Sequence, residues 1–103
     1  MSQDIDVDEL AARMAAGVVV VDVREPGEYA AAHVPGTRLI PMGELGARID
    51  ELERDRTIHV ICATGNRSGA VRRALAQAGY DAVNVAGGTD AWMRSGRPVE
   101  KGL

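Results

Sequence analysis

The chain has 103 residues, of which 46% are hydrophobic, and a formal net charge of −3. This composition is typical of one folded domain of ordinary size and argues against disorder. The small negative charge gives no reason to expect nucleic acid or an anionic membrane as a partner, and a single cysteine without a Cys/His cluster predicts neither an internal disulfide nor a metal site.

The N-terminal segment is acidic and lacks the basic start of a signal peptide, and no apolar run approaches the length of a membrane span. We therefore expect a cytoplasmic protein without a membrane partner. Asp6 as N-cap and Glu9 three residues later predict the start of a helix, and Gly17 stands where that helix would stop.

Strand-like and helix-like patterns alternate along the rest of the chain. Val18–Val21 is uniformly apolar, as expected of a strand buried in the middle of a parallel sheet. The further elements that we predict are a helix over 26–32, a short strand over 38–41, an amphipathic helix over 44–54, a strand over 57–61, a helix over 68–78, a strand over 82–85 and a helix over 89–95.

This alternation indicates an α/β fold with a mostly parallel sheet covered by helices on both faces. We expect a single domain with its core over about residues 5–98 and a tail over 99–103. Functional sites of such sheets lie beyond the carboxyl ends of the strands. The rule brings Asp22–Arg24, Cys62 and the Gly87-Gly88 turn to one edge.

The only cysteine, Cys62, ends the strand over 57–61 and begins a small polar loop before a helix. Backbone N–H groups of such a loop and the positive end of the helix converge on one point and favour a thiolate there. Gly65 permits the left-handed turn that such a cradle needs, and Arg67 adds a permanent positive charge that we expect to lower the thiol pKa. The alternative is that Cys62 is a small core residue.

Other polar residues near this edge have two interpretations each. Asp22 and Arg24 either brace the cysteine loop or form a local ion pair. His33 is interpreted as a cap of a helix C-terminus rather than as a general acid or base. Trp92 is expected to fill core space, and Gly87-Gly88 to be a turn and helix start rather than a phosphate cradle.

Four residues separate Cys62 from Arg67, whereas tyrosine and dual-specificity phosphatases have five between their cysteine and arginine. Ile61 also stands where those enzymes have a histidine. A shorter loop forms a tighter cradle, better matched to the terminal sulfur of a persulfide than to a phosphoryl group. The spacing therefore disfavours a phosphatase or arsenate reductase.

Four stretches together resemble the single-domain rhodaneses, of the rhodanese homology (sulfurtransferase) family. They are Val21–Tyr29, His33–Thr37, Cys62–Ser68 and Gly87–Trp92. The resemblance implies a five-stranded parallel sheet and a sulfurtransferase that moves a sulfane sulfur from thiosulfate or a persulfide donor to cyanide or a thiol acceptor, without a cofactor.

The resemblance also implies residue roles. Cys62 would be the nucleophile and would carry a persulfide, and Asp22 and Arg24 would support the site. The residues that would bind the donor are Ala63, Thr64, Gly65, Asn66, Arg67 and Ser68. Because some members carry basic residues where Ala63 and Thr64 stand, poor thiosulfate binding would follow. A non-enzymatic persulfide carrier or docking module is the alternative function.

Overall fold

The computed structural model describes residues 3–103 and contains a five-stranded sheet in the order β1-β5-β4-β2-β3. Every neighbouring pair of strands is parallel. This confirms the prediction of an α/β fold with a five-stranded parallel sheet. The strands are β1 (Asp4–Ile5), β2 (Val19–Asp22), β3 (Arg38–Leu39), β4 (Ile58–Ile61) and β5 (Ala82–Val85).

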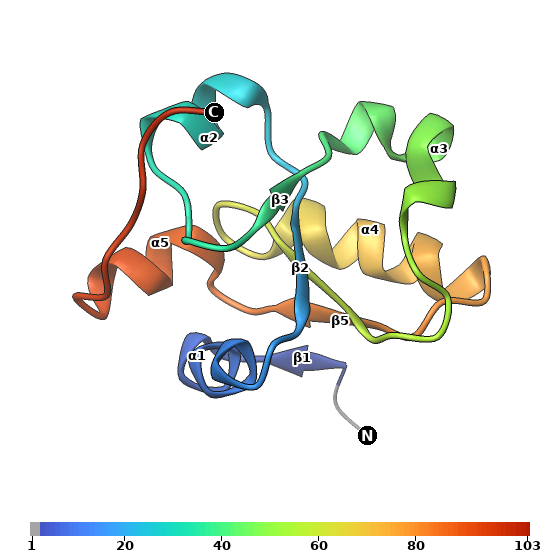
Figure 1. Ribbon diagram of the computed structural model, residues 1–103, viewed down its shortest axis with the longest axis horizontal. Coiled ribbons are helices and arrows are strands. Elements are labelled where there is room, and N and C mark those ends of the chain that lie inside the picture. Colours follow the sequence, from blue (N-terminus) through green and yellow to red (C-terminus); the bar gives the residue numbers. More distant parts are fainter. Residues whose placement is uncertain (1–2) are drawn as a thin grey trace.

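Helices cover both faces of this sheet, as predicted. They are α1 (Val7–Ala15), α2 (Pro26–Ala31), α3 (Leu45–Arg48), α4 (Asn66–Gln77) and α5 (Gly88–Arg94). In Figure 1, α3 and α4 lie to the right of β2, and α1 and α5 lie to its left. Val20 and Val21 show the consequence of strand alternation, since they belong to two different core clusters on opposite faces of β2.

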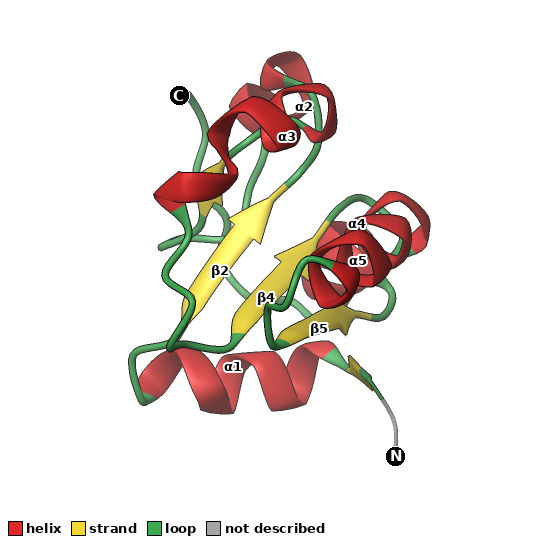
Figure 2. Cartoon of the chain, turned by 90° about the vertical axis from the view of Figure 1, so that its right-hand side faces the viewer, coloured by secondary structure: helices red, strands yellow, loops and turns green. Residues whose placement is uncertain are grey.

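The carboxyl ends of the central strands lie level with one another. Asp22 of β2 pairs with Ile61 of β4, and β2, β4 and β5 run in the same direction side by side (Figure 2). Beyond the strands, the Val23 N–H donates to the Ile61 carbonyl over 3.0 Å, and the Thr89 N–H donates to the Cys62 carbonyl over 2.8 Å. The segments that follow three strands therefore meet at one edge, as the topology predicted.

The prediction of one continuous helix over 44–54 is wrong. The chain there makes a 3-10 turn at Met42–Glu44, one α-helical turn in α3 and a second 3-10 turn at Ile49–Glu51, after which Leu52 is extended. Gly46 lowers helix propensity within the segment, while Leu45 and Leu52 still reach the core. The apolar side chains still point into the core, although the backbone coils more tightly and less regularly than a continuous α-helix. The strand β1 was not predicted, because Asp4 is charged and Ile5 stands alone between polar residues, so the segment shows no apolar run.

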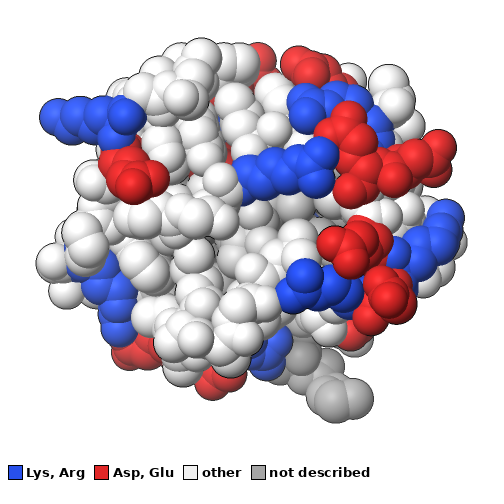
Figure 3. Space-filling model, viewed as in Figure 1, with Lys and Arg blue, Asp and Glu red and all other residues white. Residues whose placement is uncertain are grey.

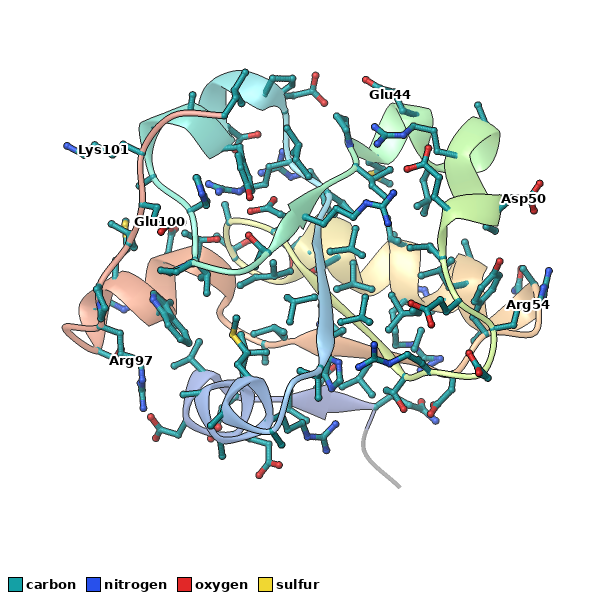
Figure 4. The ribbon with its side chains drawn as sticks, in the orientation of Figure 1. Glu44, Asp50, Arg54, Arg97, Glu100 and Lys101 are labelled. Atoms are coloured by element: carbon teal, nitrogen blue, oxygen red, sulfur yellow. The ribbon has the colours of Figure 1, made fainter. Side chains whose placement is uncertain are left out.

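Acidic and basic side chains alternate over this segment on one face of the molecule (Figure 3). Arg48 pairs with Glu44 and with Glu51, and Arg38 pairs with Glu51. Figure 4 shows Glu44 and Asp50 projecting outward from the same region. These exposed pairs contribute little to stability individually.

The residues that we predict as a tail, 99–103, form no helix and join no strand of the sheet, but they are held against the domain. The backbones of His33 and Glu100 exchange hydrogen bonds of 2.8 and 2.9 Å, and the Gly102 N–H donates to the Ala30 carbonyl over 2.8 Å. Figure 4 shows Glu100 on this segment and Lys101 pointing away from the molecule. The C-terminal segment therefore lies along α2.

Among residues 3–103, none of the helices has both the length and the apolar character that crossing a bilayer requires.

Candidate active site

Cys62 lies directly after β4, at the N-terminal end of α4, and its side chain is buried, with 1% of the residue exposed. Its sulfur accepts hydrogen bonds from the Gly65 N–H over 3.1 Å and from the Ser68 hydroxyl over 3.2 Å. The loop thus closes around the sulfur atom. Cys62 also packs in a core cluster, but a core residue does not need these polar donors, and they distinguish the sulfur from an inert apolar group.

The loop is held in this shape from both sides. Gly65 adopts a φ of 103°, the left-handed conformation predicted for it, and turns the chain into α4. On the other side, the Cys62 carbonyl accepts from the Thr89 N–H and hydroxyl, and the Ala63 carbonyl accepts from the Asp90 N–H over 3.0 Å. These carbonyls point towards the start of α5, and the N–H groups of the loop point towards the sulfur.

Burial of the Cys62 sulfur opposes ionisation, but hydrogen bonds from the Ser68 hydroxyl and from the backbone N–H groups of Ser68, Gly65 and Thr64 outweigh it, so the pKa of the thiol is lowered. A larger fraction of Cys62 is therefore thiolate near neutral pH than in a free cysteine. The thiolate is the nucleophilic form of a cysteine, so this environment is compatible with chemistry at the sulfur.

Asn84 is a site residue that the sequence analysis missed. Its Oδ1 accepts from the Ser68 hydroxyl over 2.6 Å, and its Nδ2 donates to the Gly65 carbonyl over 3.3 Å. A hydroxyl has one hydrogen, so Ser68 donates either to Asn84 or to the Cys62 sulfur, and ionisation of the thiol favours the sulfur. The available signal was an amide inside the otherwise apolar strand β5, since buried polar side chains have partners.

Substituting Ser68→Ala is expected to raise the pKa of the Cys62 thiol, because the largest of the contributions that favour the thiolate is removed. A hydrogen bond to a charged group contributes about 1.5–3 kcal/mol, so alkylation of Cys62 by iodoacetamide at pH 7 should slow by roughly tenfold or more. The rate at high pH, where the thiol is fully ionised, should change little. The pH–rate profile of alkylation measures both quantities.

The matched control for this prediction is Ser95→Ala, which removes a hydroxyl bonded to the Trp92 carbonyl at the end of α5. Its pH–rate profile should coincide with that of the unsubstituted protein. If the Ser68→Ala profile also coincides with it, then Ser68 does not stabilise the thiolate.

Arg67 lies at the rim of the loop, and its guanidinium is paired with Glu28 of α2. The two N–H groups donate to the two carboxylate oxygens over 2.7 and 2.9 Å, which is a bidentate geometry. The hydrogen bonds from Ser68 and the loop N–H groups are the main causes of the lowered thiol pKa. The pKa of Arg67 is raised by its hydrogen bonds to Glu28 and also by the charge of Cys62, so Arg67 and Cys62 attract each other in the direction that we predicted. Local sequence patterns do not indicate this pair, because Glu28 and Arg67 are 39 residues apart.

Asp22 and Arg24 form a buried ion pair beside the site. The exposed fraction is 0% for Asp22 and 5% for Arg24. Arg24 Nε and one terminal nitrogen donate to both oxygens of Asp22, and the same terminal nitrogen donates to the Ala32 carbonyl over 2.9 Å. Of the two interpretations of Asp22, the local ion pair with Arg24 is the one observed. The pair ties the end of β2 to the end of α2.

His33 and Trp92 both lie where the sequence predicted them. His33 Nδ1 lies 2.8 Å from the Tyr29 carbonyl near the end of α2, which confirms a helix-capping position. Trp92 is buried in a core cluster, and α5 begins at Gly88, both as predicted. Within the part of the chain that the structure describes, no group of three His, Cys, Asp or Glu side chains is arranged to hold a metal ion.

The fold and the loop define a class of α/β proteins in which a reactive cysteine follows a central parallel strand and lies in a backbone N–H cradle. A model of the rhodanese-like domain family matches residues 6–95. The chain therefore belongs to the rhodanese-like domain family, in agreement with the resemblance stated above.

Relatives of known sequence and structure agree with this assignment. A sulfurtransferase of Allochromatium vinosum is 36% identical over 102 residues, which cover 96% of this chain and 95% of that protein. YrkF of Bacillus subtilis, provisionally named a sulfur carrier protein, is 37% identical over 87% of this chain and 45% of its own length.

Two solved structures have the same fold over nearly the whole chain. A rhodanese-related protein from Thermoplasma volcanium is 39% identical with a TM-score of 0.88, covering 94% of this chain and 96% of that one. A rhodanese-like domain protein from Staphylococcus aureus is 34% identical with a TM-score of 0.88, and both chains are covered completely.

Proposed function

We propose that the protein is a sulfurtransferase that moves a sulfane sulfur from thiosulfate or a persulfide donor to cyanide or a thiol through a persulfide on Cys62. The observation that carries this proposal is the sulfur of Cys62, surrounded by hydrogen-bond donors from Gly65 and Ser68 and with a lowered thiol pKa. The name of the Allochromatium vinosum relative, a sulfurtransferase, supports it.

The reaction has two displacements. In the first, the Cys62 thiolate attacks the sulfane sulfur of the donor, the donor S–S bond breaks, and sulfite or a thiolate leaves with the bonding electron pair. The outer sulfur of the resulting persulfide lies in the cradle formed by residues 63–68. In the second, cyanide or a thiolate attacks this outer sulfur and Cys62 leaves as thiolate, so no net oxidant or reductant is needed.

Within this proposal, Ala63, Thr64, Gly65, Asn66, Arg67 and Ser68 bind the transferred sulfur and the adjacent part of the donor. The backbone N–H groups of the loop stabilise the negative charge of the outer sulfur, as an oxyanion hole does for oxygen. Asp22 and Arg24 keep the ends of β2 and α2 in place and support the loop without touching the reacting atoms.

A persulfide carrier that hands its sulfur to a partner protein is the second candidate. It is favoured by the burial of Cys62, which would shield a stored persulfide from solvent, and by the provisional name of YrkF. Repeated turnover with small thiols or cyanide distinguishes an enzyme from a carrier, since a carrier alone would release at most one sulfur per chain.

The proposal is tested by the intact mass of the protein after brief incubation with thiosulfate or with glutathione persulfide. We expect a gain of one sulfur atom that is removed by cyanide and is absent from Cys62→Ser. No gain from either donor would contradict sulfur transfer through Cys62. An unchanged gain in Cys62→Ser would place the sulfur on another group.

A further inference from the structure

The charged side chains at the mouth of the site cancel in pairs. Arg24 is neutralised by Asp22, and Arg67 by the bidentate carboxylate of Glu28. The Arg67 guanidinium holds the pKa of Glu28 at about 2, so this carboxylate stays ionised at neutral pH. Two positive and two negative groups therefore leave no net side-chain charge around Cys62.

No other cation of the loop restores a positive charge. Ala63, Thr64 and Asn66 are uncharged. The next arginines along α4, Arg72 and Arg73, line a hollow together with Gly65 and Asn66 of the loop, but Cys62 does not line it. Attraction of an anion to the sulfur therefore depends on the backbone N–H groups and the N-terminus of α4, which amount to about half a unit charge.

The Glu28 carboxylate has a second hydrogen-bond donor besides Arg67. Glu28 accepts a hydrogen bond from the Glu25 N–H over 3.1 Å, as part of the capping box at the start of α2. The carboxylate is therefore positioned by its own helix as well as by Arg67. About 38% of the Arg67 side chain and 37% of the Glu28 side chain are exposed, so both are accessible to an incoming donor.

We propose that Glu28 is a specificity-determining residue that neutralises Arg67 and so selects persulfide donors over thiosulfate. This inference rests on the proposed sulfur transfer and deepens it by naming the class of donor. A persulfide brings at most one negative charge to the reacting sulfur, whereas thiosulfate is a dianion that must also place a sulfonate group at the mouth. Without an unpaired cation, the dianion meets the Glu28 carboxylate and has no compensating partner.

The favoured step is balanced without a further reagent. The Cys62 thiolate attacks the outer sulfur of R–S–SH, the S–S bond breaks, and R–S⁻ leaves while Cys62 becomes Cys–S–SH. The negative charge of the Cys62 thiolate leaves with R–S⁻, and the persulfide that forms on Cys62 is neutral. Thiosulfate follows the same course with sulfite as the leaving group, so selection between the donors arises from charge at the mouth rather than from chemistry at the sulfur.

The test is Glu28→Gln, which keeps an acceptor for the Glu25 N–H but removes the charge that neutralises Arg67. Second-order rates of Cys62 persulfide formation are measured with thiosulfate and with glutathione persulfide. We expect the thiosulfate rate to rise about tenfold and the persulfide rate to change less than about threefold, from the removal of one charge close to the dianion. The matched control is Glu53→Gln, which makes the same change of net charge at an exposed position of the 52–57 connection.

Two further measurements keep the test independent of the folding of one variant. Raising the salt concentration should scarcely change the thiosulfate rate of the unsubstituted protein, but should slow that of Glu28→Gln several-fold. Arg67→Gln, which leaves Glu28 unpaired, should lower the thiosulfate rate further. If sulfur loading persists but the ratio of the two donor rates is the same in all variants, the inference is overturned and sulfur transfer stands. If no variant loads sulfur from either donor, both are overturned.

Discussion

Substituting Arg24→Met is expected to destabilise the folded protein by about 3–5 kcal/mol, because it leaves the carboxylate of Asp22 buried without its counter-ion. Asp22 is 0% exposed, and three of its hydrogen bonds come from the Arg24 side chain. Methionine fills much of the space but offers no donor. At about 4–8 °C per kcal/mol for a domain of this size, the melting temperature should fall by at least about 12 °C.

The double variant Asp22→Asn/Arg24→Met separates the buried charge from the lost packing. We expect it to recover more than half of the lost stability, because no unpaired ion remains inside the protein. Arg97→Met removes an arginine from a surface pair with Asp8 and should cost less than about 1 kcal/mol. An Arg24→Met variant that melts like Arg97→Met would show that the pair contributes no more than a surface pair does.

Substituting Gly88→Ala should destabilise the protein by about 2–5 kcal/mol and disorder the cysteine loop. Gly88 has a φ of 58°, and a Cβ there would lie 2.4 Å from the Cys62 carbonyl oxygen and 2.6 Å from that of Ala63. These are backbone atoms, so the loop must move away from α5. We expect the reactivity of Cys62 towards iodoacetamide at pH 7 to change together with the melting temperature.

Gly96→Ala is the matched control, because Gly96 has a φ of 81° but no atom within 4 Å of an added Cβ. It carries the backbone cost of about 1–2 kcal/mol without the collision. Equal melting temperatures for the two variants would mean that the contact between Gly88 and the loop is relaxed at no cost.

The alternation of strand and helix patterns was enough to predict the parallel sheet and the edge at which Cys62 lies. Val18–Val21 is apolar over its whole length and Thr57–Ile61 is mostly apolar, a local pattern typical of strands that are buried on both faces. The loop after Cys62 was also recognisable locally, because Gly65 and the polar residues around it contrast with the strand before them. Asp6 and Glu9 likewise predicted the start of α1 correctly, since a helix cap involves only residues close in sequence.

The sequence by itself therefore determined the α/β class, the order of most elements and the position of Cys62 at the edge of the sheet. Only the tertiary structure decided which groups act on its sulfur. The Ser68 hydroxyl has a second hydrogen-bond partner in Asn84, 16 residues away. Arg67 forms an ion pair with Glu28, 39 residues away. Such pairings depend on how helices and strands pack across the sheet, and no local periodicity records them. The charge that an incoming donor meets is consequently a property of the fold rather than of the loop alone.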